Sequence, residues 1–244
     1  MAKVICIYGS PSSGKTTLAV KLGCMISRTK KNCGVLFCNP FPSPLSYVFP
    51  RFQEKNFCSV GEVLSKETIT EDDVMKSLIT PSHNSYICFS GYSCFDSKNT
   101  YPETDLMRCN EYIKLLGENL DYLIIDSDFD STESELGKAA FLYSDKRICT
   151  ATPDIKGVSW LNSCRDILTP NPEDEILVNI DTVGNDCPVS LETYRLSCHC
   201  KLSLPYSTEI CTQFQSGKLL DKNNSRTENV IYRISELVKE NEQQ

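Results

Sequence analysis

Gly9-Ser10-Pro11-Ser12-Ser13-Gly14-Lys15-Thr16 fits the pattern G-x-x-x-x-G-K-[ST] at every position. Residues 4–8, directly before it, form a continuous apolar run that is typical of a strand buried on both faces of a parallel sheet. After it, apolar residues recur at helical spacing from position 18 to position 26. The sequence therefore predicts a strand, a tight turn and a helix, which is the arrangement in which this pattern binds phosphate.

The groups in this turn suit a nucleoside triphosphate with magnesium. Glycines let the backbone curl until successive N–H groups converge on the phosphates, and the helix N-terminus adds a favourable dipole. Lys15 is expected to reach the β- and γ-phosphates, and the Thr16 hydroxyl to ligate the metal. A chance match in a turn rich in glycine and serine is the alternative, which the flanking strand and helix disfavour. The predicted phosphate-binding residues are Gly9, Ser10, Pro11, Ser12, Ser13, Gly14, Lys15, Thr16 and Thr17.

Another predicted strand, the apolar run at residues 122–125, ends on Asp126. An acid in that place is typical of a Walker B carboxylate, which holds the metal, usually through water. We therefore expect Thr16 to bind magnesium directly and Asp126 to bind it through water. Asp130 is interpreted as a solvated loop acid, and the sequence leaves open whether Asp128 assists at the site.

The rest of the chain alternates between the same two patterns. Apolar runs at residues 34–38, 86–89, 147–151 and 176–180 alternate with helical patterns at 70–78, 103–119, 132–143 and 155–167. This order predicts an α/β fold with a doubly wound, mostly parallel sheet flanked by helices, and places a ligand at the carboxyl ends of the strands. A last helix, predicted at 228–240, carries mixed charges, so we expect it to pack on the core and not on a membrane surface.

The bulk composition limits the class of protein. With 244 residues and 40% hydrophobic content, the chain fits one domain spanning residues 1–244. A formal net charge of -7 does not support general binding to DNA or to an anionic membrane. The sequence has neither an apolar run of about 18 to 20 residues nor a signal-peptide pattern, so a cytoplasmic protein is expected.

The 14 cysteines mostly lie within apolar runs, where a free thiol packs as a small hydrophobic group. A reducing cytoplasm would keep them as thiols. The densest cluster comprises Cys187, Cys198, His199 and Cys200, with Cys211 nearby. Because the cluster lacks the paired C-x-x-C spacing of zinc sites, a structural role is favoured over metal binding.

The order of the motifs resembles the MinD/ParA family of P-loop ATPases over most of the chain. That family has a D-x-D-P pattern after its second strand, a Walker B strand like YDYIIID, a T-x-P turn and a later strand that ends on asparagine. The matching segments here are VLFCNPFP at 35–42, DYLIID at 121–126, TATPD at 150–154 and ILVN at 176–179. The segments LPY at 204–206 and SGKLL at 216–220 are similar to the family's last conserved stretch.

The resemblance implies ATP and magnesium as ligands and a nucleotide-dependent homodimer. It assigns Asn179 to hydrogen-bond adenine and Pro205 and Tyr206 to border the base. The guanine signature N-K-x-D is missing, so ATP is expected rather than GTP. The alternative for Asn179 is a turn residue at a strand end, a place where asparagine is common.

Three departures from the family pattern bear on hydrolysis. Ser10 occupies the position of a lysine that reaches the partner's phosphates, and Asn39 and Phe41 align with the two acids of the D-x-D motif. Without that cation and a water-positioning acid, slow or negligible ATP hydrolysis is predicted, and no catalytic residue is assigned.

The departures look most like those of the TadZ/CpaE branch, whose members localise pilus or secretion machinery. A partition or conjugation accessory ATPase fits the pattern equally well, and a protein partner from such a system is expected. The main alternative is a small-molecule enzyme, similar to dethiobiotin synthetase or to a kinase. Its acceptor site would have to come from Ser12, Asn39, Asp96 and Asp128, which form no recognisable arrangement.

A third possibility is an interaction module that has lost nucleotide binding, which the intact Lys15, Thr16 and Asp126 disfavour. The stretch 41–57 carries three prolines and five aromatic residues where the family has its nucleotide-responsive switch and partner surface. Its aromatic side chains could be an exposed docking surface or could be buried at the sheet edge, and the sequence leaves both open. The aromatic residues are Phe41, Tyr47, Phe49, Phe52 and Phe57.

Overall fold

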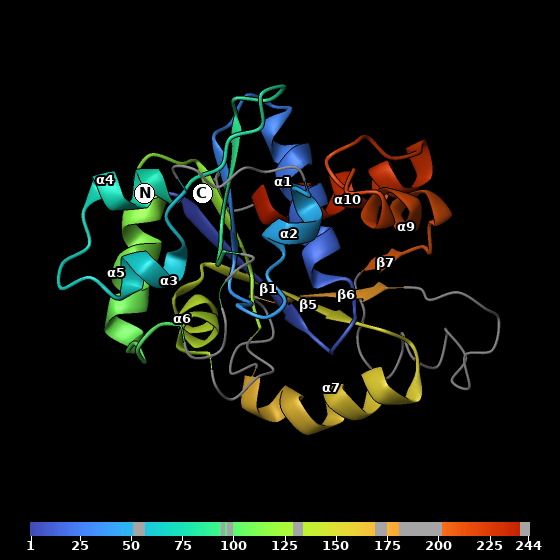
Figure 1. Ribbon diagram of the computed structural model, residues 1–244. Coiled ribbons are helices and arrows are strands. Elements are labelled where there is room, and N and C mark those ends of the chain that lie inside the picture. The colour runs from blue at the N-terminus through green and yellow to red at the C-terminus, as the bar shows by residue number, and fades with distance from the viewer. Residues whose placement is uncertain are drawn as a thin grey trace.

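The computed structural model describes residues 1–50, 57–93, 96, 100–128, 134–168, 175–180 and 202–239. Seven strands form one sheet in the order β3-β2-β4-β1-β5-β6-β7, and every pair of neighbouring strands is parallel (Figure 1). The predicted doubly wound parallel sheet is confirmed. The strands are β1 (Lys3–Gly9), β2 (Cys33–Phe37), β3 (Ile87–Ser90), β4 (Tyr122–Asp126), β5 (Lys146–Ala151), β6 (Glu175–Ile180) and β7 (Leu202–Leu204).

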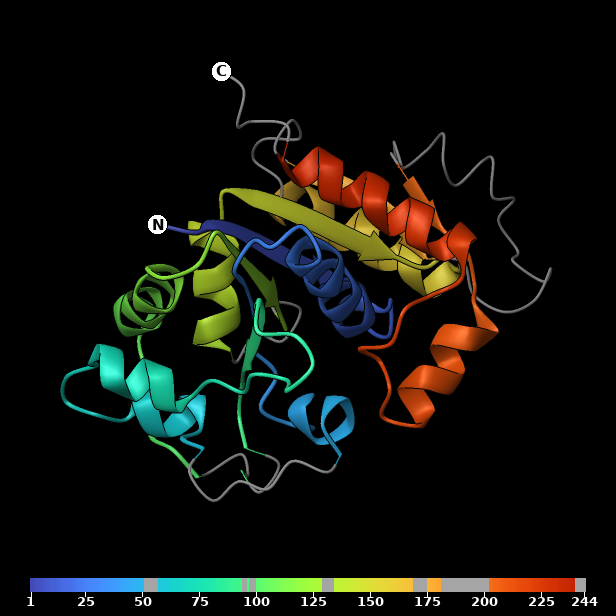
Figure 2. The same ribbon diagram turned by 90° about the horizontal axis from the view of Figure 1, so that it is seen from above.

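Helices cover both faces of the sheet (Figures 1 and 2). Alternate residues of β1 point to opposite faces, as the two-residue period of a strand requires. Ile5 and Ile7 pack with α1 and α10, whereas Cys6 and Tyr8 pack with α5, α6 and α7. The helices are α1 (Lys15–Ser27), α2 (Leu45–Val48), α3 (Val60–Leu64), α4 (Glu71–Lys76), α5 (Leu106–Gly117), α6 (Glu135–Tyr143), α7 (Ile155–Leu168), α9 (Thr208–Gln215) and α10 (Ser225–Lys239).

Two predicted helices begin at different residues in the structure. The helix predicted at 103–119 is α5, which starts later because the Asp105 side chain accepts a hydrogen bond from the Arg108 backbone N–H at 2.8 Å. The last helix starts at Ser225 and not at residue 228. Its Ile231, Ile234 and Val238 are buried, so the prediction that it packs on the core is confirmed.

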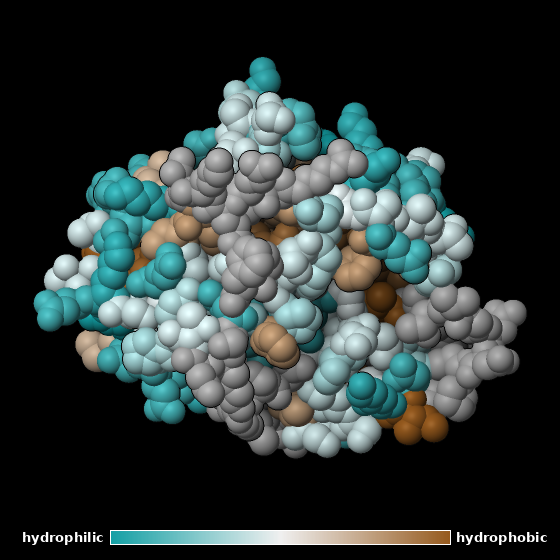
Figure 3. Space-filling model, viewed as in Figure 1, coloured by the Kyte–Doolittle hydropathy of each residue, from teal (hydrophilic) through white to brown (hydrophobic). Residues whose placement is uncertain are grey.

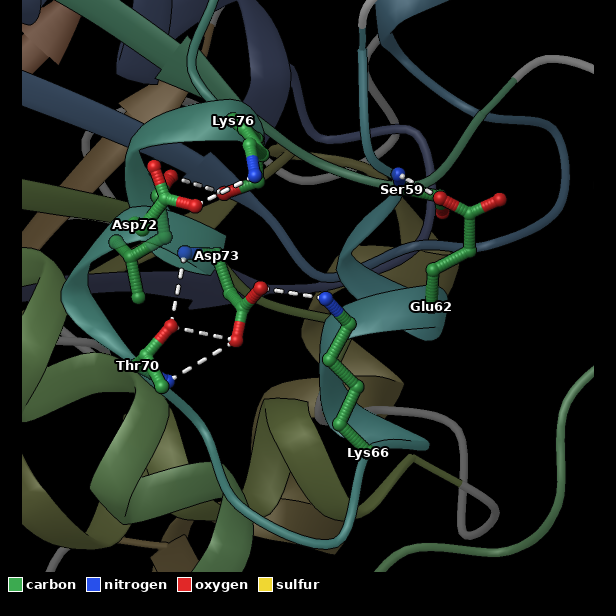
Figure 4. Close-up of polar contacts among 9 residues, drawn as sticks. Ser59, Glu62, Lys66, Thr70, Asp72, Asp73 and Lys76 are labelled. Atoms are coloured by element: carbon green, nitrogen blue, oxygen red, sulfur yellow. Dashed lines mark hydrogen bonds and ion pairs between the residues drawn. The ribbon is translucent and has the colours of Figure 1, made fainter.

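Two short helices, α3 and α4, lie next to each other at the edge of the molecule beside α5 (Figures 1 and 4). The side chain of Thr70 accepts a hydrogen bond from the Asp73 N–H, and the Asp73 carboxylate accepts one from the Thr70 N–H, so the two residues form a capping box. Lys66 donates to the same Asp73 carboxylate at 2.5 Å. The Lys66 ammonium and the Thr70 groups hold the pKa of Asp73 at about 2, below its ordinary value.

No helix within the described ranges combines the length and the apolar character needed to span a bilayer.

Candidate functional site

The turn after β1 has a backbone that requires glycine at two positions. Gly9 has φ 151°, and a Cβ atom there would lie 1.9 Å from the carbonyl oxygen of Thr150 on β5. Gly14 is the N-cap of α1 and is left-handed, with φ 78°. Ser12 also has a positive φ, of 61°. The chain therefore curls tightly between strand and helix, as the motif predicts.

Hydrogen bonds to β5 hold the curled turn in place. The Ser10 N–H donates to the Thr150 carbonyl at 3.0 Å, and the hydroxyls of Ser13 and Thr150 are 2.6 Å apart. Lys15 folds over the turn, and its Nζ donates to the carbonyls of Gly9 at 3.1 Å and Ser10 at 3.3 Å. The lysine ammonium thus lies beside the backbone that would surround a phosphate group.

Thr16 and Asp126 meet at the carboxyl end of the sheet. β1 and β4 are neighbours with Ile7 paired to Asp126, and the Thr16 Oγ1 donates to Asp126 Oδ2 at 2.5 Å. Asp126 is buried. A hydroxyl and a carboxylate are oxygen ligands of the kind that magnesium prefers, and magnesium also keeps water and phosphate oxygens. The described residues contain no group of three His, Cys, Asp or Glu side chains able to hold a metal alone, so a cation here needs those further oxygens.

Tyr47 lies on α2 and packs against α9. Its ring lies 5.1 Å from the ring of Phe214, centroid to centroid. Burial raises the pKa of Tyr47 above its ordinary value. From the sequence, Tyr47 was placed in the 41–57 stretch, but no contact with Phe214 was predicted.

Asn179 lies on β6, two strands away from β1 in the sheet order. It is fully buried, and its Nδ2 donates to the hydroxyl of Ser203, its partner residue on β7, at 3.0 Å. Pro205 and Tyr206 follow β7 and line an open pocket of about 340 Å³. The first residues of α9 and α10 complete that lining, so the predicted base-bordering residues do face an open space.

The residues that depart from the family pattern have local structural contacts. Asn39 accepts a hydrogen bond from the Phe41 N–H at 2.9 Å, which fixes a turn after β2. The Phe41 side chain is 71% exposed. Ser10 is fully buried, and its hydroxyl has no hydrogen-bond partner among the described residues. None of the three supplies a cation or a carboxylate.

Asp96 was named as an acceptor-site residue for the small-molecule enzyme considered above. In the structure its carboxylate is hydrogen-bonded within a loop. Its carboxylate accepts hydrogen bonds from the Ser59 hydroxyl at 2.6 Å, the Ser93 N–H at 2.9 Å and the Tyr101 hydroxyl at 2.7 Å. These contacts explain Asp96 as a loop-fixing residue. Asp128 is half-buried, and Asp130 lies outside the described residues.

One of the described aromatic residues of the 41–57 stretch is exposed and the others are half-buried, so neither an exposed docking surface nor burial at the sheet edge describes them all. Phe41 is exposed, whereas Tyr47 and Phe49 are half-buried, with the Phe49 ring 4.9 Å from the Phe89 ring on β3. Phe57 packs against the core, and Phe52 lies outside the described residues. On the face shown in Figure 3, brown residues form small, separate areas among hydrophilic ones.

The described cysteines are free thiols, as predicted. Cys6 is fully buried, and this burial raises its pKa to about 12, so it stays protonated at neutral pH. Cys211 is a half-buried free thiol on α9. The other members of the predicted cluster, Cys187, Cys198, His199 and Cys200, lie outside the described residues.

Comparisons with known proteins find similarity in structure. No protein-family model matches the sequence, and no curated protein matches it. The septum site-determining protein MinD of Pyrococcus horikoshii, solved with Mg-ADP, has a TM-score of 0.77 at 16% identity and covers 98% of this chain and 96% of its own. Apo McdA of Cyanothece has a TM-score of 0.74 at 16% identity, with 98% and 100% covered.

A putative plasmid partition protein of Borrelia burgdorferi, bound to AMPPNP, has a TM-score of 0.71 at 15% identity, and covers 98% of this chain and 99% of its own. These similarities extend over nearly the whole length of each chain. At such low identity they establish the fold and leave the function to the geometry of the site. The chain has the seven-stranded parallel fold of the MinD, McdA and plasmid partition proteins.

Proposed function

We propose that the chain binds ATP with magnesium on the turn Gly9 to Thr16. The observation that carries this proposal is the joint placement of Lys15 over the turn and of Thr16 2.5 Å from Asp126. Folding alone does not require a lysine inside a glycine turn. The site lies at the carboxyl ends of parallel strands, where α/β sheets bind their ligands.

ATP rather than GTP is the proposed nucleotide. The buried Asn179 is expected to hydrogen-bond adenine, and Pro205 and Tyr206 to border the base. Pro205 and Tyr206 line an open pocket with the first residues of α9 and α10, and the assignment of the base to them follows from the resemblance to the MinD/ParA family. In a competition assay, an Asn179→Ala variant should show a smaller ratio of ATP affinity to GTP affinity than the wild type. The reason is that the Asn179 amide is the group assigned to hydrogen-bond adenine.

We propose that nucleotide binding controls the position of a cargo or of a protein machine in the cytoplasm. The solved structures with this fold include a septum site-determining protein, a plasmid partition protein and a MinC:MinD complex, in which that MinD has a protein partner. A nucleotide-dependent homodimer and a protein partner from a localisation, partition or secretion system follow from the same proposal. The branch similar to TadZ/CpaE is one form that it could take.

Slow or negligible hydrolysis is part of the proposal. Hydrolysis of ATP needs charge stabilisation at the phosphates and an oriented water molecule. The buried hydroxyl of Ser10 and the turn-forming amide of Asn39 supply neither, and Phe41 extends into solvent. No observation in the described residues favours the small-molecule enzyme, because Asp96 already accepts three hydrogen bonds.

Two measurements on one sample test this function. Light scattering should show a dimer with ATP and magnesium and a smaller species without nucleotide, and phosphate release should stay close to the spontaneous rate. Brisk phosphate release would contradict the assignment of slow hydrolysis. A mass that does not respond to ATP would contradict the nucleotide-dependent dimer.

A further inference from the structure

The first residues of α9 and α10 line one pocket of about 340 Å³, and the two helices start at the same side of the molecule (Figure 2). That volume lies within the range of small-molecule sites. Apart from Pro205 and Tyr206, the lining consists of polar residues from the two helix starts. None of the lining residues belongs to the turn Gly9 to Thr16, so the pocket is built separately from the phosphate-binding turn.

Each helix has unused hydrogen-bond donors at its start. The Ser207 side chain accepts a hydrogen bond from the Ile210 N–H and caps α9. The Asn224 side chain accepts one from the Thr227 N–H at 3.1 Å and caps α10. The first two N–H groups of each helix have no partner among the described residues, and they belong to Thr208, Glu209, Ser225 and Arg226. Unpaired N–H groups and the positive ends of two helix dipoles attract an anion.

Thr227 gives a second observation, which does not depend on the helix ends. It is 1% exposed and lines the pocket, and its hydroxyl has no hydrogen-bond partner in the described part of the chain. A buried hydroxyl without a partner is unfavourable, and a ligand in the pocket would supply the missing acceptor. The side chains of Ser225 and Arg226 also make no hydrogen bond or ion pair within the described ranges, so their donors are available to the same ligand.

Side-chain contacts hold the two helix starts in place. The Glu209 carboxylate on α9 accepts a hydrogen bond from the Asn224 N–H at 2.8 Å. Farther along α9, the Gln213 side chain accepts from Lys21 on α1 at 2.5 Å and donates to the Lys222 carbonyl at 2.9 Å. The donors are therefore positioned before a ligand arrives, which lowers the entropic cost of binding.

We propose that this pocket binds the phosphate group of a small phosphomonoester. Its lining offers N–H groups, hydroxyls and a guanidinium, whereas a phosphate offers acceptor oxygens and negative charge. The Arg226 guanidinium is suited to bind two phosphate oxygens at once, and its charge offsets that of Glu209. Pro205 and the ring of Tyr206 provide an apolar surface for the organic part of the molecule. The inference goes beyond the proposed binding of ATP on the turn Gly9 to Thr16.

The test uses the Lys15→Ala protein without nucleotide, because this substitution weakens phosphate binding on the turn. Arg226→Gln removes the cation at an exposed position, and Thr227→Val replaces the buried hydroxyl with a methyl group of similar size. Arg233→Gln is the matched control, since Arg233 is an exposed arginine farther along α10. Thermal unfolding of each protein checks the fold, and the exposed Arg226 keeps the test valid if Thr227→Val is unstable.

Inorganic phosphate, phenyl phosphate and adenosine are titrated into each protein in a calorimeter at fixed ionic strength. Both phosphates should bind to the Lys15→Ala protein. Adding Arg226→Gln or Thr227→Val should weaken their binding by about tenfold, because each change removes a hydrogen bond to a charged group. Adding Arg233→Gln should leave both affinities within about twofold.

Three results would overturn the inference. The first is that neither phosphate binds, or that both bind equally well with and without Arg226→Gln. The second is that inorganic phosphate binds and phenyl phosphate does not, which would exclude an organic phosphomonoester. The third is that adenosine binds and neither phosphate does, which would make the pocket a site for the base alone. A wild type that binds no ATP, together with phosphate binding that is lost in Arg226→Gln, would overturn the proposed function and leave this inference intact.

Discussion

Lys21 gives the structure a testable dependence on pH. It lies on α1, two turns after the phosphate-binding turn, and only 3% of it is exposed. Its Nζ donates to Gln213 Oε1 at 2.5 Å and to the Asp221 carbonyl at 2.8 Å. Burial lowers the pKa of Lys21 from 10.5 to about 8, because these neutral acceptors do not fully replace water around the charge.

The sign of the effect follows from the two pKa values. The folded protein releases the Lys21 proton near pH 8, whereas the unfolded chain keeps it to about pH 10.5. Between these values the unfolded chain binds more protons, so the contribution of Lys21 to the free energy of unfolding rises with pH. For that pair of pKa values the rise between pH 7 and 9.5 is about 2 kcal/mol.

Urea denaturation of the wild type and of Lys21→Met, followed by circular dichroism at both pH values, tests this magnitude. Cysteines and tyrosines of the unfolded chain also titrate in this range, and the comparison between the two proteins cancels their effect. The difference in free energy of unfolding, wild type minus Lys21→Met, should rise by about 2 kcal/mol. Lys114→Met, at an exposed position on α5, should show no such rise relative to the wild type. If the difference in free energy of unfolding between the wild type and Lys21→Met is the same at pH 7 and pH 9.5, the lowered pKa of Lys21 is refuted.

Three further substitutions test the fold around the site. Gly9→Ala should destabilise the protein by about 3 kcal/mol or more, because its Cβ would lie 1.9 Å from the Thr150 carbonyl; a melting temperature equal to that of the wild type would contradict the turn geometry. Tyr112→Phe should cost about 1 to 3 kcal/mol in urea denaturation, because the buried hydroxyl contacts two serine hydroxyls at 2.9 and 2.7 Å; a loss below about 0.5 kcal/mol would show that these contacts contribute little. The folded pKa of Asp73 is depressed by Lys66, so its stabilisation is present above pH 4 or so and is lost as the pH falls toward 2. Asp73→Asn should therefore flatten the acid side of the stability curve, and an unchanged acid limb would argue against this pair.

The sequence predicted those parts of the fold that repeat a regular pattern. An apolar run and a helical apolar pattern lie on either side of a recognisable turn, so β1 was predicted to within a residue at each end and α1 was predicted to follow the turn. The position of Asp126 at the end of a strand placed it near Thr16, because neighbouring parallel strands end at one edge of the sheet. These predictions depend on patterns that are visible along the sequence, namely an apolar period, a motif and the residue at which a strand ends.

The elements that the sequence did not predict depend on tertiary contacts. α2 has four residues and β7 has three, which is too short for a period to appear. β7 is recognisable as a strand by its pairing with β6. The ring contact of Tyr47 with Phe214 requires the chain to fold back after β2 in one particular way, and no spacing in the sequence encodes that path.

Calorimetric titration of ATP with magnesium into the wild type, Lys15→Ala and Lys114→Ala is the most direct test of the central claim. The wild type and Lys114→Ala should bind with a micromolar Kd. Lys15→Ala should bind about 10- to 100-fold more weakly, because it loses charge-assisted hydrogen bonds to the phosphates. Absence of binding in the wild type, or equal binding in Lys15→Ala, would contradict the assignment of Gly9 to Thr16 as a nucleotide site.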